Sequence, residues 1–334
     1  MNGALKVGVS GATGMVGRSV VSTLAQAGHS VLALARSPQP ALFQGLPAVS
    51  FAAADLTTVD PLELQSLCKG LDVLVHAAGF VDPLAGREEV FAVNLGGTRK
   101  IFEAATAAGV RQFIHISSLS VITGQEDQFD LDESAPLRRC GEAYADSKVE
   151  SEEFISKQNG PMVWTILRPG FIYGEGERSW LPRVIASIRG GQAVLVDGGK
   201  RQTNVVYAGN LSRAVMLCLL NEKSYGQVFN ITDGEPVTKK QLFDAVADAC
   251  GSPRIKKDLP RWLLQPVCTL VTAFARGASA PVRAGLARFS PAAFRLVAVN
   301  QGFSIKKAQT LLGYPDKQCL PFAEAMRLTL KSFK

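Results

Sequence analysis

The stretch Leu5–Gly28, LKVGVSGATGMVGRSVVSTLAQAG, contains a short apolar run, a glycine-rich turn and an amphipathic run, in that order. The apolar run is typical of a buried parallel strand, and the amphipathic run predicts a helix that ends near Gly28. The glycines between them are spaced GxxGxxG, a spacing that permits a tight turn and lets a pyrophosphate approach the backbone at the positive end of the helix. The stretch therefore predicts a dinucleotide-binding βα turn, and a glycine-rich turn that binds nothing is the alternative. The residues expected to contact the phosphates are Gly11, Thr13, Gly14, Met15, Val16 and Gly17.

Composition limits the class of protein. The 334 residues are 47% hydrophobic and 19% charged, enough for a large α/β core. The N-terminus lacks the pattern of a secretory signal, and no apolar run reaches eighteen residues, so we expect neither export nor a spanning helix. The six cysteines form no CxxC pair and the three histidines are far apart. A cytoplasmic protein without a metal site is expected.

Strand-like and helix-like segments alternate through the first half of the chain, which predicts a doubly wound parallel sheet. A polar stretch at 121–141 is expected to be a surface loop. The expected strands are 30–35, 49–54, 71–76 and 113–116, and the expected helices are 61–68, 88–108 and 142–158.

The ends of two expected strands bear on the cofactor. Arg36 follows the second strand, where an acidic residue would bind a free ribose 2′-hydroxyl and a basic one accommodates a 2′-phosphate. This favours NADP(H), with NAD(H) left open and a merely solvated arginine as the alternative. Ala77 and Ala78 follow the strand that ends at His76, and small residues there let a flat cofactor lie close to the backbone.

Tyr144 and Lys148 are four residues apart, so on a helix they lie on one face. A nearby ammonium lowers the pKa of a phenol, and the pair could then exchange a proton with an alcohol or ketone. Ser118 follows a central strand at the edge where such sheets bind ligands, and it could hold the carbonyl oxygen. A Tyr-x-x-x-Lys spacing alone is common by chance; its order after a nucleotide turn and a serine-bearing strand gives it meaning.

Taken together, these motifs resemble the extended short-chain dehydrogenase/reductases, the NAD-dependent epimerase/dehydratase superfamily, over nearly the whole chain. The C-terminal segment, from Phe303 to Pro315, is similar to that of the 3β-hydroxysteroid dehydrogenase-like branch. The motifs that carry the resemblance are GxxGxxG at 11–17, Asp55-Leu56, HAAG at 76–79, Asn94 with Gly97-Thr98, Ser117-Ser118, YxxxK at 144–148, RPGFIYG at 168–174 and VVYAGNL at 205–211.

The resemblance implies a role for each matching residue. Tyr144 would be the general acid/base, Lys148 would support it and hold the nicotinamide ribose, and Ser118 rather than Ser117 would be the catalytic serine. Asp55 would bind the adenine, with a helix cap as the alternative, and His76 is expected to be structural rather than catalytic. The full set expected to contact the cofactor adds Arg36, Asp55, Leu56, His76, Ala77, Ala78, Asn94, Tyr144, Lys148 and Pro169 to the glycine turn.

The C-terminal third combines apolar and basic character. Between Leu259 and Pro315 there is no Asp or Glu, whereas seven Lys and Arg residues there equal the whole net charge of +7. This predicts a hydrophobic substrate, sterol-like or a long 3-oxo acid, for which an anionic group is left open. It also predicts a peripheral membrane contact through 259–300. Packing of an ordinary core is the alternative. Nucleic acid is not expected, because aromatic residues are not interleaved with the charges.

The resulting prediction is a Rossmann-type α/β fold with a smaller, mostly helical C-terminal substrate-binding domain. Residues 1–174, with 203–232 returning to the sheet, would form the NAD(P)-binding domain, and 175–202 with 233–334 the substrate-binding domain. The expected activity is an NADP(H)-dependent interconversion of a hydroxyl and a ketone by a Ser-Tyr-Lys mechanism. A nucleotide-sugar epimerase or dehydratase with NAD and a non-catalytic NADP(H)-binding sensor are the alternatives. The resemblance also implies a homodimer through the helices at 88–108 and 142–158.

Overall fold

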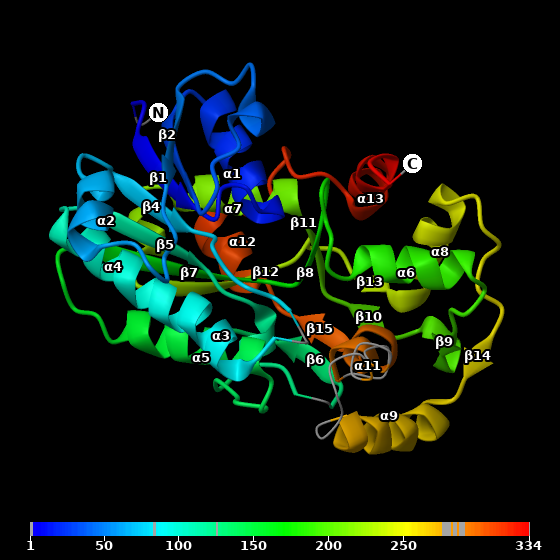
Figure 1. The fold of residues 1–334 in the computed structure, drawn as a ribbon. Helices are drawn as coiled ribbons and strands as arrows, with labels where there is room; N and C mark the ends of the chain where they lie inside the picture. Colours follow the sequence, from blue (N-terminus) through cyan, green and yellow to red (C-terminus); the bar gives the residue numbers. More distant parts are fainter. Residues whose placement is uncertain are drawn as a thin grey trace.

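The computed structural model describes residues 3–82, 85–124, 126–275, 282, 286 and 291–333. Its centre is a seven-stranded sheet in which every neighbouring pair is parallel. This confirms the predicted Rossmann-type α/β fold (Figure 1). In spatial order the strands are β12 (Gln227–Ile231), β7 (Val163–Pro169), β5 (Gln112–Ile116), β4 (Val73–His76), β1 (Lys6–Ser10), β2 (Ser30–Ala35) and β3 (Val49–Ala53).

Helices cover both faces of this sheet, because its central strands are apolar on both sides. On one face, the apolar side chains of α1, α7 and α12 share a core with β1 and its neighbours. On the other, α2, α4 and α5 pack against β4 and β5. The helix bounds are α1 (Met15–Gln26), α7 (Ala208–Cys218), α12 (Lys306–Leu312), α2 (Pro61–Cys68), α4 (Gly97–Ala107) and α5 (Ala143–Ser156). We call the sheet with these helices the nucleotide half.

A second core lies beside the carboxyl ends of the strands and is built mainly from helices. We call it the substrate half. Its helices are α6 (Leu181–Arg189), α8 (Lys239–Ala249), α9 (Arg261–Ala275), α11 (Pro291–Ala298) and α13 (Phe322–Lys331). Short strand pairs connect and border the halves: β6 (Gln128–Leu131) with β15 (Gln301–Phe303), β8 (Phe171–Tyr173) with β11 (Val205–Tyr207), β9 (Leu195–Val196) with β14 (Asp258–Leu259), and β10 (Gln202–Thr203) with β13 (Val237–Thr238).

The structure corrects four expectations. The helix expected at 88–108 is α3 (Arg87–Phe91), a π-helical segment (Ala92–Gly96) and α4 in succession. The expected loop at 121–141 contains β6, whose partner β15 lies far along the chain. The start of the segment expected to return to the sheet at 205 pairs with β8 instead, outside the seven strands. Residues 305–314, expected in the substrate-binding domain, pack in the core of α1 and α7 in the nucleotide half.

Candidate active site

The three residues predicted to be catalytic converge at the end of β5. Ser118 lies two residues beyond that strand, and Tyr144 is near the start of α5, with Lys148 one turn further on. Burial raises the pKa of Tyr144, and a hydrogen-bonding interaction with the Ser118 side chain opposes the rise. Tyr144 therefore keeps its proton at neutral pH and is suited to donate it.

Lys148 is almost fully buried, with 4% of the residue exposed. Its ammonium donates to the carbonyl oxygen of Ile116 at 2.9 Å, and burial lowers its pKa to about 8 against the opposing effect of Glu152. Burial has the largest effect on the pKa of Tyr144, whose net shift is upward, and a lowering of that pKa by Lys148 stays a prediction.

A buried ion pair separates the roles of the two neighbouring serines. Ser117 Oγ donates to Glu152 Oε1 at 2.5 Å, and the same carboxylate accepts from Arg168 Nε and Nη2. Glu152 and Arg168 side chains are 3% and 5% exposed. Ser117 is thus engaged in the interior, whereas Ser118 Oγ accepts from Ser120 N and interacts with Tyr144. The choice of Ser118 over Ser117 as the catalytic serine stays a prediction.

Asn94 lies in the π-helical segment, where one extra residue widens a turn of the helix. Such segments are often found at functional sites. Its side chain is fully buried: Oδ1 accepts from Phe80 N at 2.7 Å, while Nδ2 donates to Phe80 O and to Ser147 Oγ. Asn94 thereby ties the segment after β4 to α5, which carries Tyr144 and Lys148. A direct contact between Asn94 and a cofactor stays a prediction.

The glycine turn has the close backbone packing that a phosphate-binding turn needs. Gly11 has φ +69°, and a Cβ added there would lie 2.6 Å from Ala78 Cα. A Cβ on Gly17 would lie 2.2 Å from Gly11 O. Gly14 is the N-cap of α1 and supplies no side-chain cap, so the first amides of the helix are left for another acceptor. These features fit a dinucleotide pyrophosphate bound by the turn and the helix end.

Arg36, Asp55 and Leu56 lie where the adenosine part of the cofactor is expected. Arg36 is exposed just beyond β2. Asp55 Oδ1 accepts from Thr57 N and Thr57 Oγ1, and these bonds, with a smaller effect of Arg36, lower the pKa of Asp55. Leu56 is buried in the core beside α2 and α4. Asp55 therefore caps a local turn. The expected alternative of a helix cap is wrong, because the N-cap of the helix that follows, α2, is Asp60. The contact of Asp55 with adenine stays a prediction.

His76 has a structural side chain, as expected. It is fully buried, with Nδ1 bonded to Ser10 Oγ at 2.6 Å and Nε2 to Thr98 Oγ1 at 2.9 Å, and burial lowers its pKa to about 3. Ala78 lies against the glycine turn, and Pro169 ends β7 in register with Ile231 of β12. The predicted cofactor residues thus gather along the carboxyl edge of the sheet, beside the substrate half.

Several functional candidates escaped the sequence reasoning. Arg18, just after the glycine turn, donates through Nη2 to Glu175 O at 2.5 Å and so links the start of α1 to the segment after β8. Its position directly after Gly17 was the available indication. Arg295 of α11 donates to both oxygens of Glu142, the residue before α5, at 2.5 and 2.7 Å. No local pattern indicates that pair.

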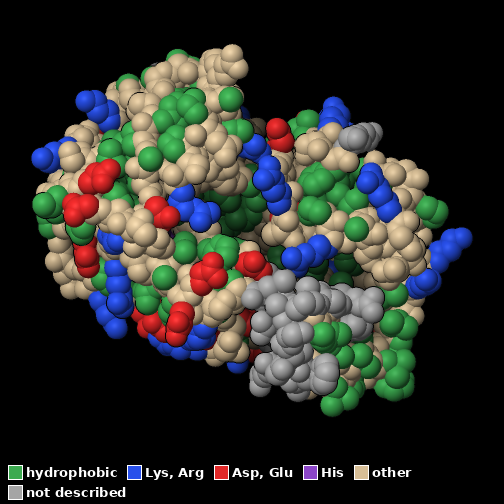
Figure 2. Space-filling view, viewed as in Figure 1, with side chains coloured by type: hydrophobic (Ala, Val, Ile, Leu, Met, Phe, Trp, Pro, Cys, Tyr) green, Lys and Arg blue, Asp and Glu red, His purple; other side chains and the backbone are tan. Residues whose placement is uncertain are grey.

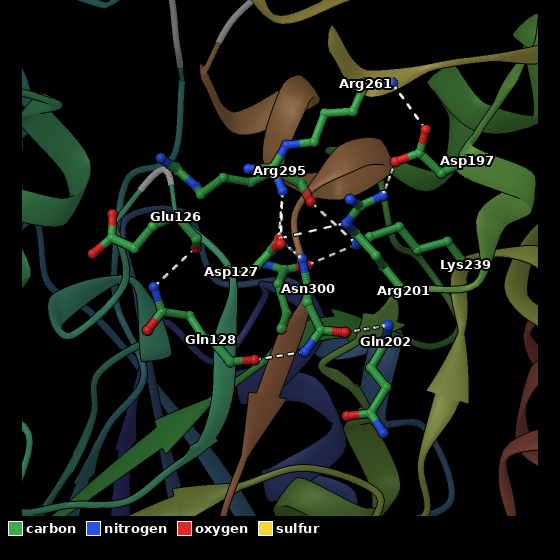
Figure 3. A network of polar contacts seen from close by, with 11 residues as sticks. Glu126, Asp127, Gln128, Asp197, Arg201, Gln202, Lys239, Arg261, Arg295 and Asn300 are labelled. Carbon is green, nitrogen blue, oxygen red and sulfur yellow. Dashed lines mark hydrogen bonds and ion pairs between the residues drawn. The ribbon is translucent and has the colours of Figure 1, made fainter.

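Asp127 is the centre of a second group of polar contacts that sequence reasoning missed (Figure 3). It accepts from Arg261 Nη1 and from Asn300 N, and Arg201 lies 3.5 Å away. Lys239 Nζ, buried close by, donates to Arg295 O and Gln301 Oε1 at 3.1 Å. Residues from both halves therefore meet in one network. Figure 2 shows the surface hollowed between the two halves, with Lys and Arg side chains at the rim.

Comparison with known proteins gives one family. The model described as the 3-beta hydroxysteroid dehydrogenase/isomerase family matches residues 8–261. A Mycobacterium tuberculosis protein named 3 beta-hydroxysteroid dehydrogenase/Delta 5-->4-isomerase is 29% identical over 95% of this chain and 90% of its own. A Stigmatella aurantiaca protein named 4-hydroxy-2-methyl-3-oxo-4-farnesyl-3,4-dihydroquinoline-1-oxide ketoreductase is 32% identical over 73% of this chain and 72% of its own.

The fold also matches solved structures. A short-chain dehydrogenase/reductase superfamily protein from Agrobacterium tumefaciens, solved with bound NAD, is similar with a TM-score of 0.72 and 22% identity, over 98% of this chain and 97% of that one.

Proposed function

Because the chain belongs to the 3-beta hydroxysteroid dehydrogenase/isomerase family, and is thus an NAD(P)-dependent oxidoreductase of the short-chain dehydrogenase/reductase type, we propose that it reduces a ketone on a hydrophobic substrate with NADPH. The observation that carries this proposal is the meeting of Ser118, Tyr144 and Lys148 at the end of β5, at the carboxyl edge of the sheet. Family membership argues against the non-catalytic sensor, and the names of both relatives argue against a nucleotide-sugar epimerase.

Each catalytic residue has one task in this mechanism. Ser118 donates a hydrogen bond to the carbonyl oxygen of the substrate, and Tyr144 gives its proton to that oxygen as the hydroxyl forms. When bound, NADPH supplies the hydride. Lys148, whose pKa lies near 8, places positive charge one turn from the phenolate that remains and so favours its formation. In the reverse direction the same residues act as the base and oxygen holder for an alcohol.

NADP(H) rather than NAD(H) is the proposed cofactor. The support is Arg36 beyond β2, at the place where a 2′-phosphate would lie, with Arg18 as a second cation near the glycine turn. Thermal unfolding with NADPH and NADH tests the preference. We expect the larger stabilisation with NADPH, lost in Arg36→Leu; equal shifts with both cofactors in the parent would contradict it.

The hydrophobic part of the substrate proposal is supported by the relatives' names, which specify a steroid and a farnesylated quinoline. A sterol-like compound or a long 3-oxo acid remains the proposed class. Its anionic part loses support, because Arg261, Arg295 and Lys306 of the basic segment pair with Asp127, Glu142 and Asp130. Those three cations neutralise acidic residues of the segment 126–142, so they do not indicate a site for an anionic ligand.

Two further expectations stay proposals: a cytoplasmic protein with a peripheral membrane contact, and a homodimer through α3, α4 and α5. Among the described residues, no helix combines the length and apolar character needed to span a bilayer. Sedimentation velocity of the full chain tests the dimer.

Activity tests the central proposal. Parent protein is assayed for substrate-dependent NADPH oxidation with steroid ketones and 3-oxo acids. Tyr144→Phe is expected to lower kcat about 10²- to 10⁴-fold, because the proton donor is lost while the ring remains. Tyr225→Phe is the matched control and should behave as the parent, because the neighbouring Ser224 bonds Gln112 at the start of β5, at the other end of that strand from Ser118. Full turnover by Tyr144→Phe would sink the assignment.

A further inference from the structure

Arg18 directly follows the last glycine of the turn and lies in the first part of α1. Its amide donates to Gly14 O at 2.8 Å, so Arg18 is one helical turn beyond the N-cap. Side chains of a helix lean toward its N-terminus, and the half-buried Arg18 side chain is therefore carried back over the end of α1 at which the pyrophosphate is expected. Arg18 thus has both the charge and the location of a phosphate ligand.

The charge of Arg18 is not neutralised by a carboxylate in the described part of the chain. The first turn of α1 contains no acidic residue, and the guanidinium bonds one backbone carbonyl, that of Glu175, through Nη2. Glu175, an exposed residue, thus contacts Arg18 through its backbone and not through its carboxylate. A guanidinium has five N–H donors in a fixed fork. Most of these donors, and the whole charge, therefore remain for an anion at this end of α1.

The carbonyl that Arg18 holds belongs to a short connection between β8 and α6. We call its residues, 174–177, the strap. Both ends of the strap are fixed. A Cβ on Gly174 would lie 2.9 Å from the side chain of the first residue of α7. At the other end, the buried Glu177 carboxylate accepts from three amides, those of residues 179–181, at the start of α6. The strap therefore joins the nucleotide half firmly to a helix of the substrate half.

Gly176 is the point at which the strap meets Arg18. It has φ +82°, and an added Cβ would collide with Arg18 Nη2 and lie 3.1 Å from Cζ. Glycine adopts this backbone conformation easily and leaves room for the guanidinium. The bond from Arg18 Nη2 to Glu175 O, at 2.5 Å, is made to the preceding residue. Two adjacent residues of the strap are thus fitted to the guanidinium, which holds them against the phosphate-binding end of α1.

We propose that Arg18 is a ligand of the cofactor pyrophosphate and that it holds the strap against the bound cofactor at the same time. One part of the guanidinium bonds Glu175 O, and its remaining donors bond a phosphate oxygen at the end of α1. This assignment rests on the nicotinamide dinucleotide of the proposed function and not on the ketone. The pyrophosphate is common to NADPH and NADH, so the bond from Arg18 strengthens the binding of both. Because the strap leads into α6, the same residue links cofactor binding to the substrate half.

Cofactor binding by the full chain, without any substrate, tests the assignment. The dissociation constants of NADPH and NADH, and the dissociation rate of NADPH, are measured by the change in nicotinamide fluorescence. Arg18→Met should raise both dissociation constants at least about tenfold, because a charge-assisted hydrogen bond is lost. The salt dependence of NADPH binding should also weaken, since one cation that attracts the phosphates is gone. Arg183→Met is the matched control: Arg183 is an exposed arginine of α6, and this variant should bind as the parent does.

Gly176→Ala tests the strap without a change of charge. The added methyl group takes the place of the guanidinium, so NADPH should dissociate faster than from the parent. An unchanged dissociation rate would overturn the role of the strap. Thermal unfolding without cofactor shows that each variant folds.

The other outcomes are equally decisive. Parent-like affinities in Arg18→Met, or weaker binding with an unchanged salt dependence, would overturn the phosphate contact. A loss for NADPH alone would place Arg18 at the 2′-phosphate and overturn the pyrophosphate assignment. A parent that binds NADPH but reduces no ketone leaves this assignment standing while the proposed activity fails. A parent that binds neither cofactor overturns both.

Discussion

The two halves of the molecule hold their polar groups in different ways. In the nucleotide half, the decisive ion pair, Glu152–Arg168, lies within the interior between α5 and β7, with both side chains at most 5% exposed. Between the halves, by contrast, the contacts are arginines of the substrate half on carboxylates of 126–142, at intermediate exposure. The first arrangement fixes α5 to β7 in the interior. The second joins two bodies that form separate cores, and it is where a change should alter activity more than folding.

Breaking the buried pair gives the largest expected effect. Glu152→Gln leaves Arg168 buried without its counter-charge, and also weakens the bond from Ser117. The free energy of unfolding should fall by about 3–5 kcal/mol in denaturant titration. Glu153→Gln is the matched control: the neighbouring carboxylate pairs with Arg139 at 32% and 48% exposure, and its loss should cost less than about 1 kcal/mol. Equal losses in the two variants would show that the burial of the Glu152–Arg168 pair does not set its contribution to stability.

Breaking the Arg295–Glu142 pair, which joins the two halves, should lower the catalytic rate more than the stability of the fold. Arg295→Met removes both bonds to Glu142 and frees the turn that begins α5, so Tyr144 is less well positioned. We expect kcat to fall about 10- to 100-fold. The affinity for NADPH should stay at the parent value, because the glycine turn lies elsewhere.

A double-mutant cycle with Glu142→Gln separates positioning from general damage. The double variant should be no worse than Arg295→Met, because both changes break one interaction. Lys306→Met is the control, since its pair with Asp130 is exposed at 77% and 67%. A fall in NADPH affinity equal to the fall in kcat would show that Arg295 supports the fold as a whole rather than Tyr144.

The same contrast explains what the sequence could predict. The glycine turn, the serine after β5 and the Tyr–Lys pair on α5 each depend on neighbours within a few residues, so spacing alone indicates them. The pairing of β6 with β15 joins residues about 170 positions apart, and Arg295–Glu142 joins positions 153 apart. Nothing local specifies such partners. The sequence does show that residues 126–142 are acidic and residues 259–315 are basic. It does not show that these two segments pair with each other, so the basic residues were assigned to a ligand instead.

Two further differences from expectation have local causes. The π-helical segment at Ala92–Gly96 keeps an almost helical pattern of apolar residues, so periodicity cannot reveal it. The expectation for the pKa of Tyr144 weighed the lysine one turn away without burial, which has the largest effect in the structure.

The smallest expected change in stability at neutral pH concerns His115, a buried side chain of the nucleotide half without hydrogen bonds to the described residues. His115 is fully buried, and neither ring nitrogen has a hydrogen-bond partner among the described residues. His115→Leu removes that cost, and should raise the free energy of unfolding at pH 7 by about 1 kcal/mol. His76→Leu, opposite it in register on β4, is the control and should destabilise, because Ser10 and Thr98 lose their partner.

The pH dependence gives the sharper measurement. Burial holds the pKa of His115 well below the ordinary 6.5, so below pH 6.5 the unfolded chain takes up a proton there that the folded chain does not. The parent therefore loses stability as the pH falls from 6.5. His115→Leu should lose less, with His76, whose pKa is about 3, still contributing its share. If the free energy of unfolding of His115→Leu falls below pH 6.5 as steeply as that of the parent, His115 is charged inside the fold. The surroundings of His115 near Lys148 are then more polar than the contacts of the described residues indicate.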